Sequence, residues 1–281
     1  MNDFPTGQGF LFKVEADQIN VRQDGTPGNP AIVLIHAFAG SLGQWDDVAR
    51  LLAADYHVIR MDLLGHGASD KPDTGYAMPE QADRVAAIAS ALGATEFVAV
   101  GQSGGGNVVV ALLENPEHAA RMKGGMIIGT PPDMSFVNLP AIANIYSVPL
   151  LGRLMWRITS RKMVSDTMAS LFAPNFGSVP AIVVDDFFKM TRHSYVHAKA
   201  NLEEFARAIP LSARVGSSQV PLLVVFGDQD QWIPPACVEE WARASRATTQ
   251  LMPRVGHTPP LEAPEDMAAI VAAFTWRVQA S

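Results

Sequence analysis

Short apolar runs alternate with longer amphipathic stretches through the first half of the chain. Unbroken apolar runs of this length predict strands that are buried on both faces, whereas apolar residues spaced three and four apart predict helices. The expected strands span residues 31–35, 56–61, 97–100 and 126–128, and the expected helices span residues 43–54, 79–92 and 105–113. Strands and helices that alternate in this way indicate a parallel sheet with helices on both faces.

The alternation stops at the turn Thr130-Pro131-Pro132. From there to residue 217 the sequence is helical, rich in Met and Phe, and has no convincing buried strand. The strand pattern resumes later, with an expected strand at 222–226, a helix at 237–244, a strand near 249–251 and a helix at 265–278. A strandless insertion within a sheet predicts a helical lid.

The first residues of the chain have a different pattern. Residues 10–14 and 18–21 are expected to pair as an antiparallel hairpin on one edge of the sheet. The whole pattern predicts an α/β fold with a mostly parallel, eight-stranded sheet flanked by helices. Its core domain would comprise residues 1–132 and 218–281, and residues 133–217 would form the helical cap.

Composition excludes several classes of protein. The chain has 281 residues, 48% of them hydrophobic and 17% charged, which is incompatible with intrinsic disorder. The formal net charge is -7 and no dense Lys/Arg cluster is present, so a nucleic-acid partner is not expected. The single cysteine, Cys237, excludes an intrachain disulfide and a Cys-based metal cluster. With neither a secretory signal nor an apolar run long enough to span a membrane, the chain is expected to be a soluble, cytoplasmic protein.

The segment Gly101-Gln102-Ser103-Gly104-Gly105 lies between an expected buried strand and an expected helix. A serine on such a tight turn exposes its hydroxyl group, and small neighbours prevent collisions there. The amides at the start of the following helix point at any negative charge that develops beside the serine. This context predicts that Ser103 is a nucleophile.

A serine hydroxyl requires a base that accepts its proton. Of the seven histidines, His257 lies in the loop between the last expected strand and the last expected helix. Loops at the carboxyl ends of parallel strands assemble the sites of such sheets, so His257 is the preferred base. His193 and His197, one helical turn apart in the lid, are expected on the surface rather than at a metal ion. His66 is expected in a structural loop.

The base in turn requires an acid that orients it. Asp230 follows the expected strand at residues 222–226 and would lie at its carboxyl end. Asp228, two residues earlier, is a rival that can equally cap the turn with its own side chain. Asp133, which follows another strand, is a third candidate.

Several motifs in one order carry a resemblance to a known family. These are Leu34-Ile35-His36-Ala37-Phe38, Trp45, the segment from Asp62 to Ser69, Gly101 to Gly105, Gly227 to Asp230, and Gly256-His257. Together they resemble the α/β-hydrolase superfamily, in particular its lid-bearing esterase and C–C hydrolase branch. The resemblance covers nearly the whole chain except the lid.

The resemblance implies a role for each matching residue. Ser103 corresponds to the nucleophile and His257 to the base, while Asp230, followed closely by Pro234, corresponds to the acid. The backbone amides of Phe38 and Gln102 would form the oxyanion hole. Ala37 stands where the family has glycine, so strain is expected there if the position requires a positive φ angle.

The resemblance predicts a serine hydrolase that cleaves an ester-like bond of a small-molecule substrate through an acyl-enzyme, without a metal or organic cofactor. The alternatives are a C–C bond hydrolase or lactonase with the same triad, and a ligand-binding protein that keeps the fold without turnover. The apolar lid predicts a largely apolar substrate pocket. Its expected lining residues are Met134, Phe136, Tyr146, Trp156 and Phe187.

Overall fold

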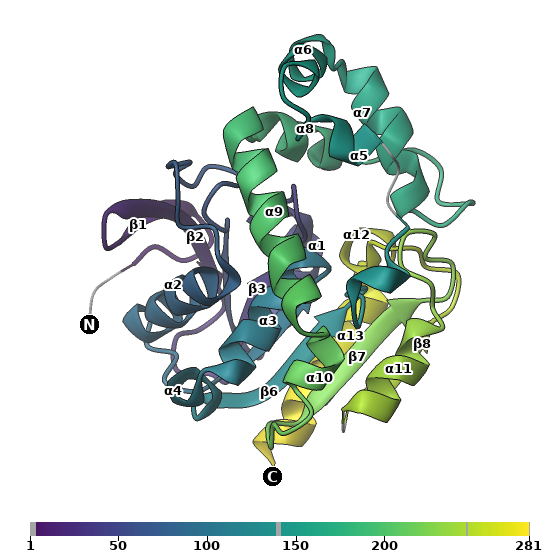
Figure 1. Ribbon diagram of the computed structural model, residues 1–281. Helices are drawn as coiled ribbons and strands as arrows, with labels where there is room; N and C mark the ends of the chain where they lie inside the picture. Colours follow the sequence, from purple (N-terminus) through teal and green to yellow (C-terminus); the bar gives the residue numbers. More distant parts are fainter. Residues whose placement is uncertain (1–3, 139–141, 246, 281) are drawn as a thin grey trace.

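One eight-stranded sheet runs through the molecule, with the strand order β1-β2-β4-β3-β5-β6-β7-β8 (Figure 1). The computed structural model describes residues 4–138, 142–245 and 247–280. The strands are β1 (Gly9–Val14), β2 (Asp17–Asp24), β3 (Ala31–Ile35), β4 (His57–Met61), β5 (Phe97–Gln102), β6 (Met122–Ile128), β7 (Leu222–Gly227) and β8 (Thr248–Met252). Strands β1 and β2 form the expected antiparallel hairpin at one edge, β2 is also antiparallel to β4, and the pairs from β4 to β8 are parallel. The predicted α/β fold class is confirmed.

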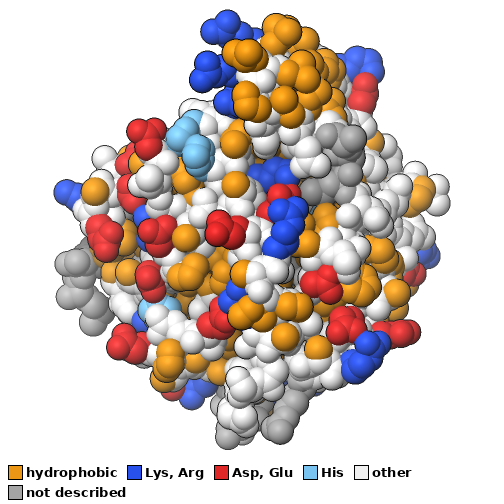
Figure 2. Space-filling view, viewed as in Figure 1, with side chains coloured by type: hydrophobic (Ala, Val, Ile, Leu, Met, Phe, Trp, Pro, Cys, Tyr) orange, Lys and Arg blue, Asp and Glu red, His pale blue; other side chains and the backbone are white. Residues whose placement is uncertain are grey.

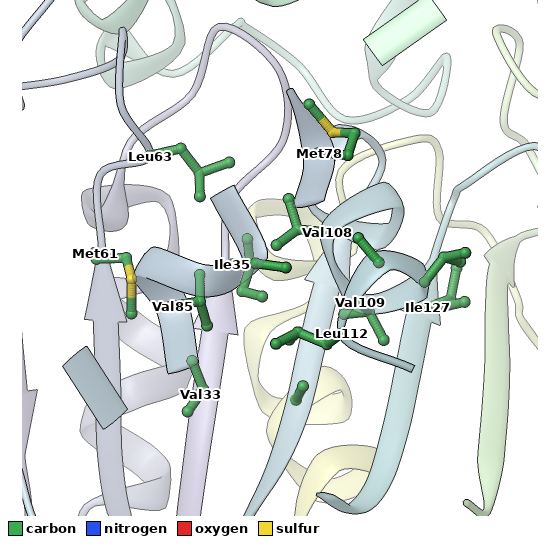
Figure 3. Close-up of a cluster of buried hydrophobic side chains, with 14 of the residues drawn as sticks. Val33, Ile35, Met61, Leu63, Met78, Val85, Val108, Val109, Leu112 and Ile127 are labelled. Atoms are coloured by element: carbon green, nitrogen blue, oxygen red, sulfur yellow. The ribbon is translucent and has the colours of Figure 1, made fainter. Parts of the chain in front are cut away.

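Helices cover both faces of this sheet. On one face lie α2 (Met78–Ala91), α3 (Gly104–Glu114) and α11 (Cys237–Ala244), and on the other lie α1 (Asp46–Leu52) and α13 (Pro264–Gln279). Because side chains alternate along a strand, each central strand supplies apolar residues to both layers. Figure 3 shows Val33 and Ile35 of β3 pointing toward Val85 of α2 and Val108 of α3.

Between β6 and β7 the described residues form helices and no strand. We call this segment, residues 133–217, the lid. Its helices are α5 (Ile142–Ile145), α6 (Leu151–Ile158), α7 (Arg161–Met168), α8 (Ala181–Lys189), α9 (Arg192–Ala208) and α10 (Leu211–Arg214). In Figure 1 helices α5 to α8 stand above the sheet layer, and α9 descends from them toward the sheet beside α3.

The other short helices of the described residues are α4 (Pro116–Ala119), α12 (Pro259–Glu262) and three 3-10 helices, at Met134–Phe136 and Ala169–Leu171 in the lid and at Leu42–Trp45 before α1. Ser41 caps the 3-10 helix at Leu42–Trp45 by accepting a hydrogen bond from Gly43 N. Among the described helices, none combines the length and the hydropathy that a membrane crossing requires.

Candidate active site

Ser103 occupies a strained turn between β5 and α3. Its φ angle of 50° and ψ angle of -113° lie in a region that residues with a side chain rarely adopt. The turn is possible because its neighbours are glycines: a Cβ atom on Gly101 would lie 2.2 Å from Gly105 O, and one on Gly105 would lie 2.4 Å from Ile35 O. The geometry is therefore that of a nucleophile elbow, with the serine hydroxyl held above the end of the sheet.

A chain of hydrogen bonds joins Ser103, His257 and Asp230. His257 Nε2 lies 3.0 Å from Ser103 Oγ, and His257 Nδ1 lies 2.7 Å from Asp230 Oδ2. A carboxylate only accepts hydrogen bonds, so Nδ1 carries the proton and Nε2 is left to accept the serine hydroxyl. The side chains of His257 and Asp230 are buried. The structure thus brings together the three residues that the sequence singles out.

The backbone of the following turn orients the Asp230 carboxylate. Its Oδ1 atom accepts hydrogen bonds from Trp232 N and Ile233 N, both at 2.9 Å, which leaves Oδ2 for His257. The two rival acids have other partners. Asp228 accepts a hydrogen bond from Arg254 N, and Asp133 accepts one from Ser135 N at the start of a 3-10 turn. Asp133 therefore caps a local turn, whereas Asp228 joins the loop after β7 to the loop after β8.

The backbone of His257 is fixed from two directions. His257 N donates a hydrogen bond of 2.6 Å to Leu171 O in the lid. On the opposite side, Gln102 Nε2 donates a hydrogen bond of 2.9 Å to His257 O. The imidazole also lies against the indole of Trp232, with 6.0 Å between the ring centroids. These contacts restrict the ring to the orientation in which it faces Ser103.

Glu262 is a residue of this site that the sequence does not reveal. Its Oε2 atom accepts hydrogen bonds from Ala173 N and Gly256 N, and its Oε1 atom accepts from both the backbone N and the Oγ1 of Thr258. The carboxylate thus holds the residues on both sides of His257 and ties them to the lid at Ala173. By its local sequence Glu262 is only an acid near the end of a short helix, which carries no signal for these contacts.

Of the two backbone amides expected to form an oxyanion hole, that of Gln102 lies within the sheet. Gln102 is the last residue of β5 and pairs with Ile128 of β6, so its backbone belongs to the sheet. Gly104 is the first residue of α3, where an amide has no partner within the helix. A Cβ atom on Gly104 would lie 2.9 Å from Phe38 N, so these two backbones face each other. The pair of amides beside Ser103 therefore belongs to Phe38 and Gly104, and Gln102 contributes its side chain instead.

The positive φ angle considered for Ala37 is found instead at Ala39. Ala39, two positions later in the same loop, has the positive φ angle, 58°, whereas Ala37 is not among the residues with a positive φ. An alanine therefore fits at position 37 without the cost that a left-handed conformation would impose.

A mostly apolar cavity of about 140 Å³ opens beside Ser103 and His257. Of the expected lining residues, Met134, Tyr146 and Phe187 line it, and Phe136 and Trp156 do not. The indole of Trp156 packs behind this wall, with its centroid 5.2 Å from the Tyr146 ring and 5.0 Å from the Phe187 ring. Other apolar lining residues are Val137, Ile142, Val164, Met168, Leu171, Val183, Leu202, Trp232 and Ile233.

The cavity also has a polar part on α9. Lys199 and Glu203, one helical turn apart, both line it and form an ion pair. Lys199 Nζ also donates a hydrogen bond of 2.7 Å to Asn144 Oδ1. Because the pair is internally compensated, it adds a polar spot to the wall without an unpaired buried charge.

The other six histidines all lie in described parts of the chain, and none of them lines this cavity. His66 is buried beside the rings of His36 and Phe38, and its Nδ1 lies 3.3 Å from Leu64 O. Burial, with a smaller contribution from His36, lowers the pKa of His66 to about 3, so this imidazole is neutral at physiological pH. His193 and His197 stack on each other on α9, with 4.1 Å between their centroids.

Residues 30–264 match the model of a family described as the alpha/beta hydrolase fold. The Mycobacterium tuberculosis protein EphD, named an oxidoreductase, is 26% identical over 92% of this chain, which spans 47% of the length of EphD. Lipase 3 of a Moraxella strain is 27% identical, over 91% of this chain and 80% of its own. The chain thus spans about half the length of the first of these relatives and most of the second.

Solved structures share the same architecture. A thermophilic esterase from Thermogutta terrifontis superposes with a TM-score of 0.80 over 97% of this chain and 99% of its own, at 21% sequence identity. At this level of identity the similarity establishes the fold, and the chemistry has to be argued from the site itself.

Proposed function

Since the chain belongs to the α/β-hydrolase fold family, we propose that it is a serine hydrolase that cleaves an ester-like bond of a small, largely apolar substrate. The observation that carries this proposal is the hydrogen-bonded chain from Ser103 through His257 to Asp230 at the wall of an apolar cavity. The similarity to Lipase 3 over most of both chains supports it.

In the proposed reaction Ser103 Oγ attacks the ester carbonyl carbon while its proton passes to His257 Nε2. Asp230 stabilises the imidazolium through Nδ1. The carbonyl oxygen becomes an oxyanion, which the amides of Phe38 and Gly104 stabilise; in known hydrolases one such donor contributes about 3–4 kcal/mol. The intermediate then collapses, and His257 returns the proton to the departing alkoxide, which leaves the acyl group on Ser103.

The second half of the reaction repeats these steps with water. His257 Nε2 accepts a proton from a water molecule, whose oxygen attacks the acyl carbon at the same oxyanion site. Collapse of this second intermediate returns the proton to Ser103 Oγ and releases the acid product. The apolar wall excludes other water and favours uncharged acyl groups.

Labelling with a fluorophosphonate probe tests the proposal. The wild type should be labelled at Ser103 and should hydrolyse p-nitrophenyl esters, and Ser103→Ala should do neither. Ser90→Ala, a change at an exposed serine on α2, is the matched control and should behave like the wild type. A folded wild type that is not labelled and does not hydrolyse esters would instead favour a ligand-binding protein.

A further inference from the structure

One end of the lid exposes a cluster of apolar side chains. We define the lid-tip surface as Val148, Leu150, Leu151, Leu154 and Ile158, whose exposed fractions range from 43% for Val148 to 78% for Leu150. The last three lie on one side of α6, at helical spacings of three and four residues. Figure 2 shows hydrophobic side chains gathered at the top of the molecule, where Figure 1 places α6.

The chain is strained at the most exposed of these residues. Leu150 has a φ angle of 60° and a ψ angle of -59°, and Leu151 N donates a hydrogen bond of 2.6 Å to Pro149 O. This geometry is that of a γ-turn with a left-handed central residue, a rare and costly conformation. The fold therefore maintains a strained turn that holds a leucine in solvent, the opposite of what burial of apolar surface would favour.

Positive charge borders the lid-tip surface. Between Asp133 and Asp166 the sequence has no acidic residue and contains four cationic ones. Arg161 and Lys162 pair with Asp185 and Asp166, which leaves Arg153 and Arg157. Arg153 and Arg157 are exposed on α6, beside the apolar side chains, and within the described part of the chain neither has a carboxylate partner. The lid tip is thus a cationic, apolar end of a molecule whose formal net charge is -7.

We propose that the lid-tip surface binds the surface of an anionic lipid bilayer. An amphipathic helix with leucines on one side and arginines beside them lies in the headgroup region, with its apolar side among the acyl chains and its cations on lipid phosphates. Two observations favour lipid over a second copy of this chain. In a two-fold contact between copies, the unpaired arginines of both copies would come close together and repel each other. An anionic membrane repels the rest of the molecule, which is negatively charged, and so orients the lid tip toward the membrane.

This binding goes beyond the proposed hydrolase activity and does not depend on it. The two helices that flank α6 in the chain, α5 and α7, contribute Ile142, Val164 and Met168 to the cavity wall. A lid tip bound to a bilayer would therefore place the helices that enclose the cavity close to the membrane. An apolar substrate dissolved in the membrane could then enter the cavity directly from it.

Sedimentation with large unilamellar vesicles tests this proposal on the 281-residue chain. The wild type should bind phosphatidylcholine vesicles that contain 30% phosphatidylglycerol and bind pure phosphatidylcholine more weakly, the difference shrinking in 0.5 M salt. Leu150→Ser/Leu154→Ser should weaken binding to the anionic vesicles on the order of tenfold or more. Arg153→Gln/Arg157→Gln should weaken it about fivefold per arginine. The control Leu11→Ser/Trp276→Ser changes two apolar residues outside the lid, exposed by 56% and 72%, and should bind like the wild type.

All of these substitutions are at exposed positions, so thermal melting should show folded variants. A wild type that stays in the supernatant with anionic vesicles would overturn the proposal. So would binding that both lid-tip variants retain, or binding that the control variant loses as strongly. Light scattering after gel filtration adds a further check: a dimer that Leu150→Ser/Leu154→Ser dissociates would assign the surface to a second copy of the chain and would also overturn the proposal.

Discussion

The backbone N–H of His257 donates a hydrogen bond of 2.6 Å to the carbonyl oxygen of Leu171, a lid residue. Glu262 makes a second connection nearby, through Ala173 on the lid side and Gly256 on the side of the histidine loop. The segment that carries the proposed base is therefore bonded directly to the lid. A displacement of this part of the lid would move the imidazole relative to Ser103, which couples the shape of the cavity to the geometry of the triad.

Glu262→Gln should lower kcat on the order of 10–100-fold, with little change in KM. The carboxylate accepts hydrogen bonds from several N–H groups, and the NH₂ group of glutamine cannot accept them. The His257 loop would therefore lose some of the hydrogen bonds that hold it in place. Small displacements of catalytic groups lower the rate strongly. The rate of fluorophosphonate labelling of Ser103 should fall with kcat. Glu265→Gln, on the exposed start of α13, is the matched control. A variant that melts at a lower temperature but keeps its labelling rate would show that Glu262 has only a structural role.

Asp230→Asn should cost far more activity than Asp228→Asn. Only Asp230 contacts His257, and an amide there favours the wrong tautomer of the imidazole, an effect of about 10⁴-fold in serine proteases. Asp228→Asn changes a contact that joins two loops, and the amide oxygen of asparagine can still accept the hydrogen bond from Arg254 N, so its effect should be a small loss of thermal stability rather than a fall in kcat. Steady-state kinetics of both purified, folded variants measure the ranking, and the reverse order would move the acid to Asp228.

Stability should fall as the pH is lowered below about 6.5, in part because of His66. Burial lowers the pKa of this imidazole to about 3 in the native protein, whereas in the unfolded chain it has its ordinary pKa of 6.5. Between these two pH values the unfolded chain binds a proton at His66 and the native protein does not. The free energy of unfolding is therefore unaffected by this group above pH 6.5, and it decreases as the pH falls toward 3, by about 5 kcal/mol at most. Urea unfolding at a series of pH values should show a shallower decline for His66→Gln than for the wild type. The exposed His197→Asn is the control, and equal declines in all three proteins would contradict the assignment.

Longer aliphatic acyl chains should be better substrates until the cavity is filled. Each buried methylene contributes about 0.8 kcal/mol, so kcat/KM for p-nitrophenyl esters should rise about fourfold per methylene over the first members of a series from acetate to hexanoate. Leu202 Cδ1 would lie 2.9 Å from a Cβ atom on Gly104, which places this side chain beside the proposed oxyanion hole. Leu202→Ala should therefore shift the preferred chain length upward, and Leu51→Ala, at an exposed position on α1, should not. Rates that are flat across the series, with charged acyl groups preferred, would contradict an apolar pocket.

Much of the fold follows from local patterns in the sequence. The buried strands were predictable from their unbroken apolar runs, and the amphipathic helices from apolar residues spaced three and four apart. Strand β6 begins earlier than its apolar run suggests, at Met122, because it includes Gly124 and Gly125. A Cβ atom on Gly124 would lie 2.8 Å from the Phe274 ring of α13, so this glycine reflects close packing of a helix rather than a break in the strand.

Some residues of the candidate site could be predicted from the sequence and others could not. Ser103, Asp230 and His257 could be predicted because each follows the carboxyl end of a parallel strand. Local sequence and sheet topology are enough to place three such residues close together. Glu262 could not, because its partners Ala173 and Gly256 come together only through tertiary packing of the lid. The residues that line the cavity could not be predicted for the same reason. Trp156 is as apolar as Tyr146, and only the packing of the lid decides that Tyr146 lines the cavity and Trp156 does not.

The central claim is that Ser103 carries the acyl group during turnover. Rapid acid quenching during hydrolysis of a slowly deacylating p-nitrophenyl ester, followed by intact-protein and peptide mass spectrometry, measures this directly. We expect one added acyl mass, located on the peptide that contains Ser103 and absent from Ser103→Ala. An acyl group on another residue, or turnover by Ser103→Ala at a rate near that of the wild type, would contradict it.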